Sequence, residues 1–112
     1  MRSYELIEPA LNHIRMNYSE DISVDSLASL SKVSKYYFCR VFKTVTGKAT
    51  MEYLRDYRLN IADIMLGNTN KSVSEISECC GFADENYFCR CYKARYGISP
   101  GKRKKLSSLD KE

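Results

Sequence analysis

Two stretches of the chain repeat one order of aromatic, cysteine and basic residues. The first is Tyr37–Arg40 and the second is Tyr87–Arg90, both with the letters YFCR, so the copies are 50 residues apart. At 3.6 residues per turn, the apolar residues of each copy fall in one stripe of a helix, and an arginine and a lysine lie on the opposite face. A guanidinium donates paired hydrogen bonds to a planar acceptor, and an ammonium supplies a point charge. Each copy therefore predicts a helix with a basic outward face.

A shorter helix is predicted before each repeated helix. The N-cap positions of all four helices hold residues whose side-chain oxygen accepts from a free backbone amide: Ser23, Ser34, Ser72 and Asp84. A short helix, a tight turn and a longer helix form a helix-turn-helix motif. We therefore expect the first motif over about residues 23–46 and the second over about 72–96.

The two tight turns are expected to differ. Matching positions are 49 apart in the shorter helices and 50 apart in the longer ones, so the second turn has one extra residue. Gly81 favours the left-handed conformation that often ends a helix, whereas Lys32 adopts it at a cost. We therefore expect the first turn to be built differently from the second.

The remaining helices complete an all-α fold. An apolar stripe predicts a helix over residues 3–18, and Pro100 suits the first position of a last helix. Between the motifs, residues 50–67 are apolar nearly all round, so this linker helix is expected to pack on more than one side. The domain is predicted over residues 1–106, followed by a disordered tail over 107–112.

Composition limits the class of protein. Hydrophobic residues make up 44% of the 112 residues. No run approaches the roughly 18 apolar residues of a membrane span, and the first residues form no apolar signal region, so a cytoplasmic protein is expected. The five cysteines are an odd number. They therefore fit a reducing compartment better than a disulfide framework.

No catalytic site, metal site or cofactor is expected. The adjacent Cys79 and Cys80 diverge around a helix, as do Cys89 and Cys91, so a zinc site is the weaker interpretation, as is a redox-sensing thiol. His13 has no paired nucleophile, and the chain shows no nucleotide-binding loop and no paired acid and base. We therefore expect that the protein is not an enzyme.

The formal charge of +4 is unevenly placed. Basic residues gather on the two repeated helices and over Lys102–Lys105, whereas acidic residues gather at Glu20–Asp25 and at Asp84–Glu85. This distribution predicts a polyanionic partner that approaches particular faces, with an ordinary solvated surface as the alternative.

The outward faces hold the side-chain types that contact DNA. The second helix of a helix-turn-helix enters the major groove, where arginine binds guanine, asparagine binds adenine and lysine meets phosphate. We expect Arg40 and Arg90 to contribute most. The candidate DNA-binding residues lie on or beside the two faces: Lys35, Tyr36, Tyr37, Cys39, Arg40, Lys43, Glu85, Asn86, Tyr87, Arg90 and Lys93. The alternative is a helical protein-interaction module with only nonspecific affinity for DNA.

Spacing predicts how two such units meet DNA. A linker helix of some 18 residues is about 27 Å long, whereas successive major grooves on one face lie about 34 Å apart. If the linker alone sets the spacing, either the DNA bends or one helix engages poorly. Unequal engagement is one expectation, because Asp84 and Glu85 place negative charge at the start of the second recognition helix.

These residues resemble the pattern of the AraC/XylS family of bacterial transcription regulators. The matching residues of the second half are Ile76–Phe82, Asp84, Tyr87–Arg90, Tyr92, Lys93 and Gly97–Pro100. Those of the first half are Leu27, Ala28, Ser34, Phe38, Arg40, Phe42, Lys43, Gly47, Tyr53, Leu54, Arg58, Leu59, Ala62 and Leu66. The resemblance covers roughly residues 5–104.

The resemblance implies a seven-helix all-α domain with two helix-turn-helix units joined by a central linker helix. It further implies a domain that binds double-stranded promoter DNA and usually activates transcription through contacts with RNA polymerase. By position, it implies that the base-reading residues are Tyr36, Cys39, Arg40, Asn86, Tyr87 and Arg90.

Four residues depart from the family pattern. Ser77 replaces a usual alanine, and Cys39 is a poor base-reading residue. Arg103 replaces a usual aromatic residue and Lys104 a usual arginine, so the last helix is expected to pack loosely. Because most members carry another domain first, we expect this chain to be the C-terminal part of a longer regulator and a monomer on its own.

Overall fold

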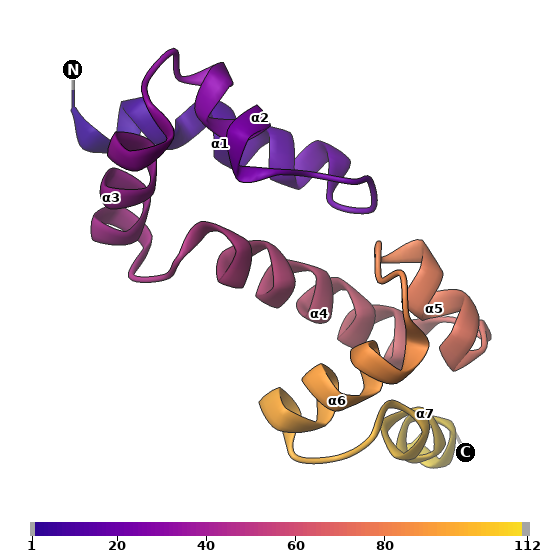
Figure 1. Cartoon of the computed structure of the whole chain (residues 1–112). Helices are drawn as coiled ribbons and strands as arrows, with labels where there is room; N and C mark the ends of the chain where they lie inside the picture. Colours follow the sequence, from indigo (N-terminus) through magenta and orange to yellow (C-terminus); the bar gives the residue numbers. More distant parts are fainter. Residues whose placement is uncertain (1, 111–112) are drawn as a thin grey trace. The chain divides into compact units, whose positions relative to one another are not determined.

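The computed structural model of the chain describes residues 2–110, and every regular element in that range is a helix (Figure 1). The helices are α1 (Ser3–Asn17), α2 (Val24–Leu30), α3 (Lys35–Thr46), α4 (Thr50–Asn68), α5 (Val73–Cys79), α6 (Glu85–Tyr96) and α7 (Pro100–Asp110). The predicted seven-helix all-α fold is confirmed. No helix of the described range has the length and apolar character to cross a membrane.

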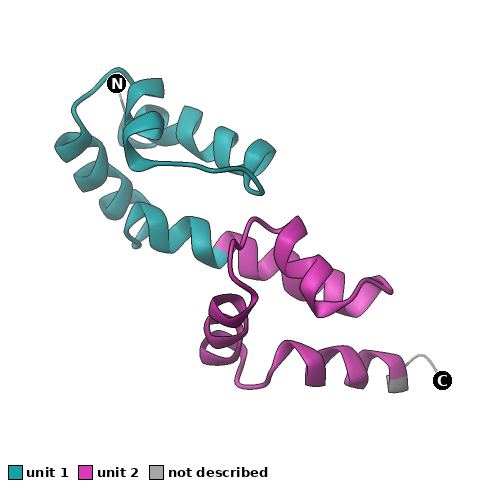
Figure 2. Ribbon diagram, turned by 45° about the vertical axis from the view of Figure 1, so that its right-hand side comes forward, with its two compact units in different colours: residues 1–56 teal, residues 57–112 magenta. Residues whose placement is uncertain are grey.

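The chain divides into two compact units, residues 1–56 and 57–112 (Figure 2). Unit 1 contains α1, α2, α3 and the start of α4, and unit 2 contains the rest of α4 with α5, α6 and α7. The domain expected over residues 1–106 thus consists of two units, each with its own core.

The core of unit 1 joins α1, α2 and α3, which all pack against one another. Its apolar side chains are at most 5% exposed: Ile7, Ala10, Ile14, Ile22, Leu27, Ala28, Phe38, Phe42 and Leu54. The ring of Phe42 meets the ring of Tyr53 edge to face, with 5.3 Å between centroids. Aromatic contacts of this kind add to the burial of apolar area, so α3 is held firmly by its inner face.

The core of unit 2 repeats this arrangement. Its buried residues are Leu59, Ala62, Leu66, Ile76, Cys80, Phe82, Phe88 and Tyr92. Equivalent stripes of the two units stand 52 residues apart: Ile7, Ala10 and Ile14 in α1, and Leu59, Ala62 and Leu66 in α4. The structural repeat therefore extends over three helices and not only over the helix-turn-helix pair.

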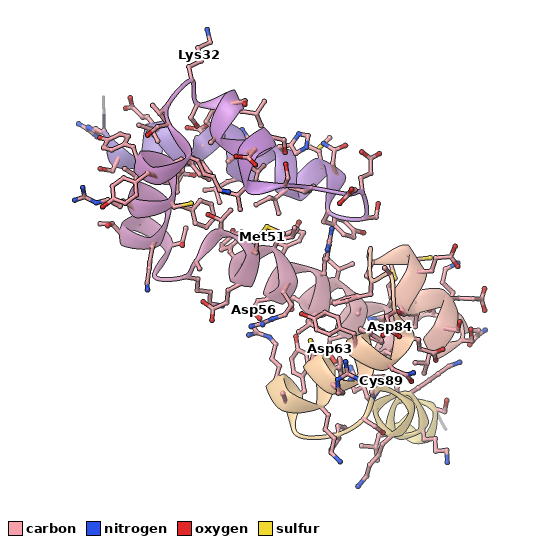
Figure 3. All side chains as sticks on the ribbon, viewed as in Figure 1. Lys32, Met51, Asp56, Asp63, Asp84 and Cys89 are labelled. Carbon is pink, nitrogen blue, oxygen red and sulfur yellow. The ribbon has the colours of Figure 1, made fainter. Side chains whose placement is uncertain are left out.

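The two turns differ in length but share a left-handed residue. The residues between helices are Ser31–Ser34 in unit 1 and Cys80–Asp84 in unit 2, which is one residue longer, as predicted. Lys32 has a φ of 57° and Gly81 a φ of 92°. The prediction of a differently built first turn is wrong at this position, because Lys32 adopts the left-handed conformation with its side chain projecting into solvent (Figure 3).

α4 is less completely buried than its composition predicts. Leu54 and Leu66 are 1% exposed, as is Leu59, but Met51 is 43% exposed and Ile64 51%. As expected of a helix that packs on more than one side, α4 contributes Leu54 to the core of unit 1 and Leu59 and Leu66 to the core of unit 2. Its faces that carry Met51 and Ile64 are exposed.

A polar cluster holds α7 on unit 2. The Arg103 Nε donates to the Asp63 Oδ1 at 3.1 Å, and the Tyr92 hydroxyl donates to the same oxygen at 2.6 Å. Burial, with this hydrogen bond, raises the pKa of the Tyr92 phenol far above its usual value. A Cβ on Gly67 would lie 2.7 Å from the Arg103 Nη2, so glycine makes room for the guanidinium. The prediction that Arg103 loosens the last helix is wrong, because the arginine is itself the contact.

α7 also continues beyond its predicted end. The helix runs to Asp110, and the buried Ser107 donates its hydroxyl to the Gly67 carbonyl at 2.9 Å. Residues 107–110 are therefore helical and not the disordered tail that was expected, while residues 111 and 112 lie outside the described range.

Candidate nucleic-acid interface

The recognition helices α3 and α6 begin at capped positions. The Ser34 hydroxyl accepts from the Tyr37 amide at 3.2 Å, and the Asp84 carboxylate accepts from the Asn86 amide at 2.9 Å. Each cap satisfies an amide that the first turn of a helix leaves free. These caps make Lys35 and Glu85 the first residues of their helices.

Buried aromatic side chains fix the rotation of both helices about their axes. Phe38 and Phe42 of α3 are fully buried, as are Phe88 and Tyr92 of α6. Because side chains at i and i+4 share one face of a helix, the opposite face is left to solvent. Both helices end at a left-handed glycine, Gly47 or Gly97, with φ of 80° and 84°.

The outward face of α3 carries a stacked arginine. The Tyr36 ring is 74% exposed, and the Arg40 guanidinium carbon lies 5.9 Å from its centroid. Such a cation–π contact restricts the arginine while leaving its donors in solvent. Lys43, almost one turn further on, is also exposed. The face therefore offers a planar donor group followed by a point charge.

The outward face of α6 is similar but not identical. The Arg90 guanidinium carbon lies 5.9 Å from the ring of Tyr87, which is three residues earlier and not four. The place that corresponds to Tyr36 is taken by Asn86, which is exposed, as is Lys93. α6 therefore shows a free amide where α3 shows a ring.

The cysteines contribute little to either face. Cys39 and Cys89 are half-buried, and burial, with the charge of Glu85, raises the pKa of the Cys89 thiol. Cys80 is fully buried, and its burial raises the pKa of the thiol to about 11, whereas Cys79 is exposed. In residues 2–110 no group of three or more His, Cys, Asp or Glu side chains is arranged to hold a metal ion.

Each unit thus gathers its own predicted residues on one helix. On α3, five of them are exposed, namely Lys35, Tyr36, Tyr37, Arg40 and Lys43, with Cys39 half-buried. On α6, all five are exposed, namely Glu85, Asn86, Tyr87, Arg90 and Lys93. Their accessibility is what DNA contact requires, and the contact itself stays a prediction.

The short helix α5 adds a charged position, Glu75, that the sequence patterns did not single out. In α2, the Ser26 hydroxyl accepts from the Ser23 amide at 3.3 Å, and in α5 the Glu75 carboxylate accepts from the Ser72 amide at 3.1 Å. The backbone hydrogen bond from Ser72 lowers the pKa of Glu75. A position-by-position comparison of charge between the two copies would have found this difference.

Comparison with known proteins identifies proteins that share this architecture. A family model described as a helix-turn-helix domain matches residues 27–105. The bifunctional transcriptional activator/DNA repair enzyme AdaA of Bacillus subtilis (strain 168) is 29% identical over 110 residues, which are 98% of this chain and 52% of AdaA. The chain spans between 32% and 52% of the length of the first three curated relatives.

Solved structures agree with the family model. The DNA-binding domain of AdpA, a global transcriptional factor in complex with a target DNA, has a TM-score of 0.86 at 25% identity over 94% of both chains. A regulator with an AraC-type DNA-binding domain from Chromobacterium violaceum also has a TM-score of 0.86, at 28% identity over 94% of both chains. The chain therefore belongs to the AraC/XylS family of helix-turn-helix transcription regulators.

Proposed function

We propose that this chain binds double-stranded promoter DNA in a sequence-specific manner, with α3 and α6 in adjacent major grooves, and that it regulates bacterial transcription, as an activator. The observation that carries the proposal is the exposed arginine on each recognition helix, packed on an aromatic ring and followed three residues later by an exposed lysine. Core packing does not require this arrangement, yet the chain has it twice.

The roles of the residues follow from their chemistry. Arg40 and Arg90 bind guanine edges, and Asn86 binds adenine, because these side chains match the paired acceptors and donors of those bases. Lys43 and Lys93 bind phosphate and fix the position of each helix on the duplex. The remaining exposed candidates border these contacts: Lys35, Tyr36, Tyr37, Glu85 and Tyr87.

Two similar proteins support regulation and DNA binding. AdaA is named a transcriptional activator, and the AdpA domain was solved with a target DNA. The proposal gives this chain a binding role and no catalytic one. In this proposal the isolated chain is a monomer, since each unit has its own core. The chain contacts RNA polymerase when it activates transcription.

Selection from a random duplex pool tests the proposal. The winning duplex is then titrated at several salt concentrations beside a scrambled duplex of equal length. We expect an asymmetric site with two preferred blocks about one helical turn apart, and an affinity for it at least about 1,000-fold above that for the scrambled duplex.

Other outcomes would point elsewhere. One preferred block would mean that one unit contacts bases and the other contacts only the backbone. No enrichment, with an affinity near the nonspecific level of about 0.1 mM to 1 µM for every duplex, would favour a protein-interaction module.

A further inference from the structure

The two helix-turn-helix motifs carry opposite formal charge on matching frameworks. Residues 23–46 contain four basic and one acidic residue, a formal charge of +3, whereas residues 72–96 contain three basic and four acidic residues, a formal charge of −1. The short helices are both seven residues long and the recognition helices both twelve. Charge is therefore compared between equivalent positions.

Four aligned positions make the second motif more negative by five charges, and the remaining positions offset one of these. Unit 1 has Ser26, Ser29, Ser34 and Lys35, where unit 2 has Glu75, Glu78, Asp84 and Glu85. All eight residues are exposed.

Helix capping does not demand the carboxylates of Glu75 and Asp84. The hydroxyl of Ser26 completes the capping box of α2, as the carboxylate of Glu75 does in α5. The hydroxyl of Ser34 caps α3, as Asp84 caps α6. Because serine performs both capping roles in unit 1, the negative charge of unit 2 needs another explanation.

We infer that the two units divide the work on DNA. Unit 1 binds a duplex of any sequence through phosphate and adds its base contacts at the selected site, whereas unit 2 binds only where base contacts offset the repulsion between its carboxylates and phosphate. This inference rests on the proposed function. Glu85 is the specificity-determining residue, because it is the first residue of α6 and stands where α3 has Lys35. A carboxylate there accepts from the amino group of cytosine and repels phosphate.

The kinds of side chain on the recognition faces point to the same division. α6 combines a carboxylate, an amide and a guanidinium at Glu85, Asn86 and Arg90, which match the edges of cytosine, adenine and guanine. At the equivalent places α3 has a lysine, a tyrosine ring and an arginine. Both arginines lie 5.9 Å from a ring centroid, so the two faces differ at the first two places and not at the arginine. α6 therefore has more base-specific groups, and α3 has fewer groups that discriminate.

Amide chemical shifts of the whole chain, measured by NMR with two duplexes, test the division directly. One duplex has the selected sequence and the other is its scrambled counterpart, and both are measured at low salt. We expect the amides of α3 to shift with both duplexes and those of α6 to shift only with the winner. Equal shifts of α3 and α6 with the scrambled duplex would overturn the inference.

Charge exchange tests the role of Glu85. Glu85→Lys should raise the affinity for the scrambled duplex about tenfold, since a gained phosphate contact steepens the salt slope by about 0.9. The ratio of specific to scrambled affinity should fall. Lys35→Glu should weaken binding to both duplexes by about the same factor and leave the ratio unchanged. Glu85→Gln, which keeps the shape of the side chain, should give a smaller change in the same direction as Glu85→Lys.

Glu8→Lys is the matched control, because it makes the same change of net charge at an exposed position of α1. It should leave the ratio unchanged. If Glu8→Lys lowers the ratio as much as Glu85→Lys, net charge and not Glu85 is responsible, and the inference fails. If no duplex is selected at all, the proposed function fails. If a duplex is selected but both units respond alike, only the division of work fails.

Discussion

Unit 1 and unit 2 fill the same place in their cores in different ways. In unit 1 the rings of Phe42 and Tyr53 meet edge to face. The residues 50 positions later in unit 2 are Tyr92 and Arg103. They do not form a ring pair, and both instead donate a hydrogen bond to the carboxylate of Asp63. An apolar contact and a polar cluster thus hold two recognition helices of equal length with the same pattern of buried positions.

Packing of the recognition helix therefore depends on a filled space and not on one kind of contact. The polar cluster is the more demanding solution, because each member needs the others and Gly67 must leave room for Arg103. Buried ionic groups seldom stabilise more than an apolar replacement of the same volume. Packing of α6 in unit 2 therefore depends on Asp63, Tyr92 and Arg103, which are far apart in the sequence, whereas packing of α3 in unit 1 depends on one contact between two rings.

The largest effect is expected from matched core truncations. Phe38 and Phe88 are both fully buried at equivalent positions, so Phe38→Ala and Phe88→Ala should each cost about 3–5 kcal/mol of the free energy of unfolding. Urea unfolding followed by amide hydrogen exchange would measure the cost and locate it. A large loss at one position and a small loss at the other would break the equivalence of the units.

Removal of either stacked arginine comes next. Arg40→Ala and Arg90→Ala should each weaken binding to the selected duplex by about 1–3 kcal/mol, because each loses a paired contact to a base. Titration of the scrambled duplex serves as the control for a general loss of charge. No change at either position would contradict the placement of both helices in major grooves.

The polar cluster of unit 2 can be replaced by the aromatic contact of unit 1. Asp63→Leu alone should cost about 1–3 kcal/mol of unfolding free energy, since Tyr92 and Arg103 lose their acceptor. The lower part of that range is expected, as the Asp63 and Arg103 side chains are 29% and 31% exposed.

The triple variant Asp63→Leu, Tyr92→Phe and Arg103→Tyr gives unit 2 the residues of unit 1 at these places, since Leu11, Phe42 and Tyr53 are their equivalents. It should lie within about 1 kcal/mol of the parent. Thermal and urea unfolding would compare the three proteins. A triple variant no more stable than the single one would show that the aromatic solution does not transfer.

The smallest effect concerns the turns. Gly81→Ala should cost about 1–2 kcal/mol, because an alanine Cβ is disfavoured at positive φ, whereas Lys32→Ala should change stability by less than about 0.5 kcal/mol. Lys32 already carries a side chain at a φ of 57°, so alanine adds no new strain. Equal losses from the two substitutions would contradict this explanation, because the added Cβ at position 81 would then carry no special cost.

Much of the fold was predictable because it follows local rules. Ser23, Ser34, Ser72 and Asp84 all cap the helices that their positions predict. The repeated YFCR order placed Phe38 and Phe88 inside and Arg40 and Arg90 outside, as observed. Capping and helical periodicity act within a few residues, so both can be predicted from the sequence.

The errors share a different physical origin. Lys32 adopts a conformation that its residue type disfavours, because the packing of α2 on α3 fixes the turn. Arg103 departs from the aromatic pattern, yet it packs well because Asp63 and Tyr92 lie beside it. In both cases contacts between segments overrode a preference of the single residue.

The seven helices, their caps, the duplication and the two basic outward faces follow from the sequence alone, because periodicity and charge are properties of the chain. The contacts that close each core, an aromatic pair in unit 1 and the cluster of Asp63, Tyr92 and Arg103 in unit 2, are visible only in the folded molecule. The physical reason is that residues 63, 92 and 103 are far apart along the chain, and a hydrogen bond forms only when folding brings donor and acceptor within about 3 Å.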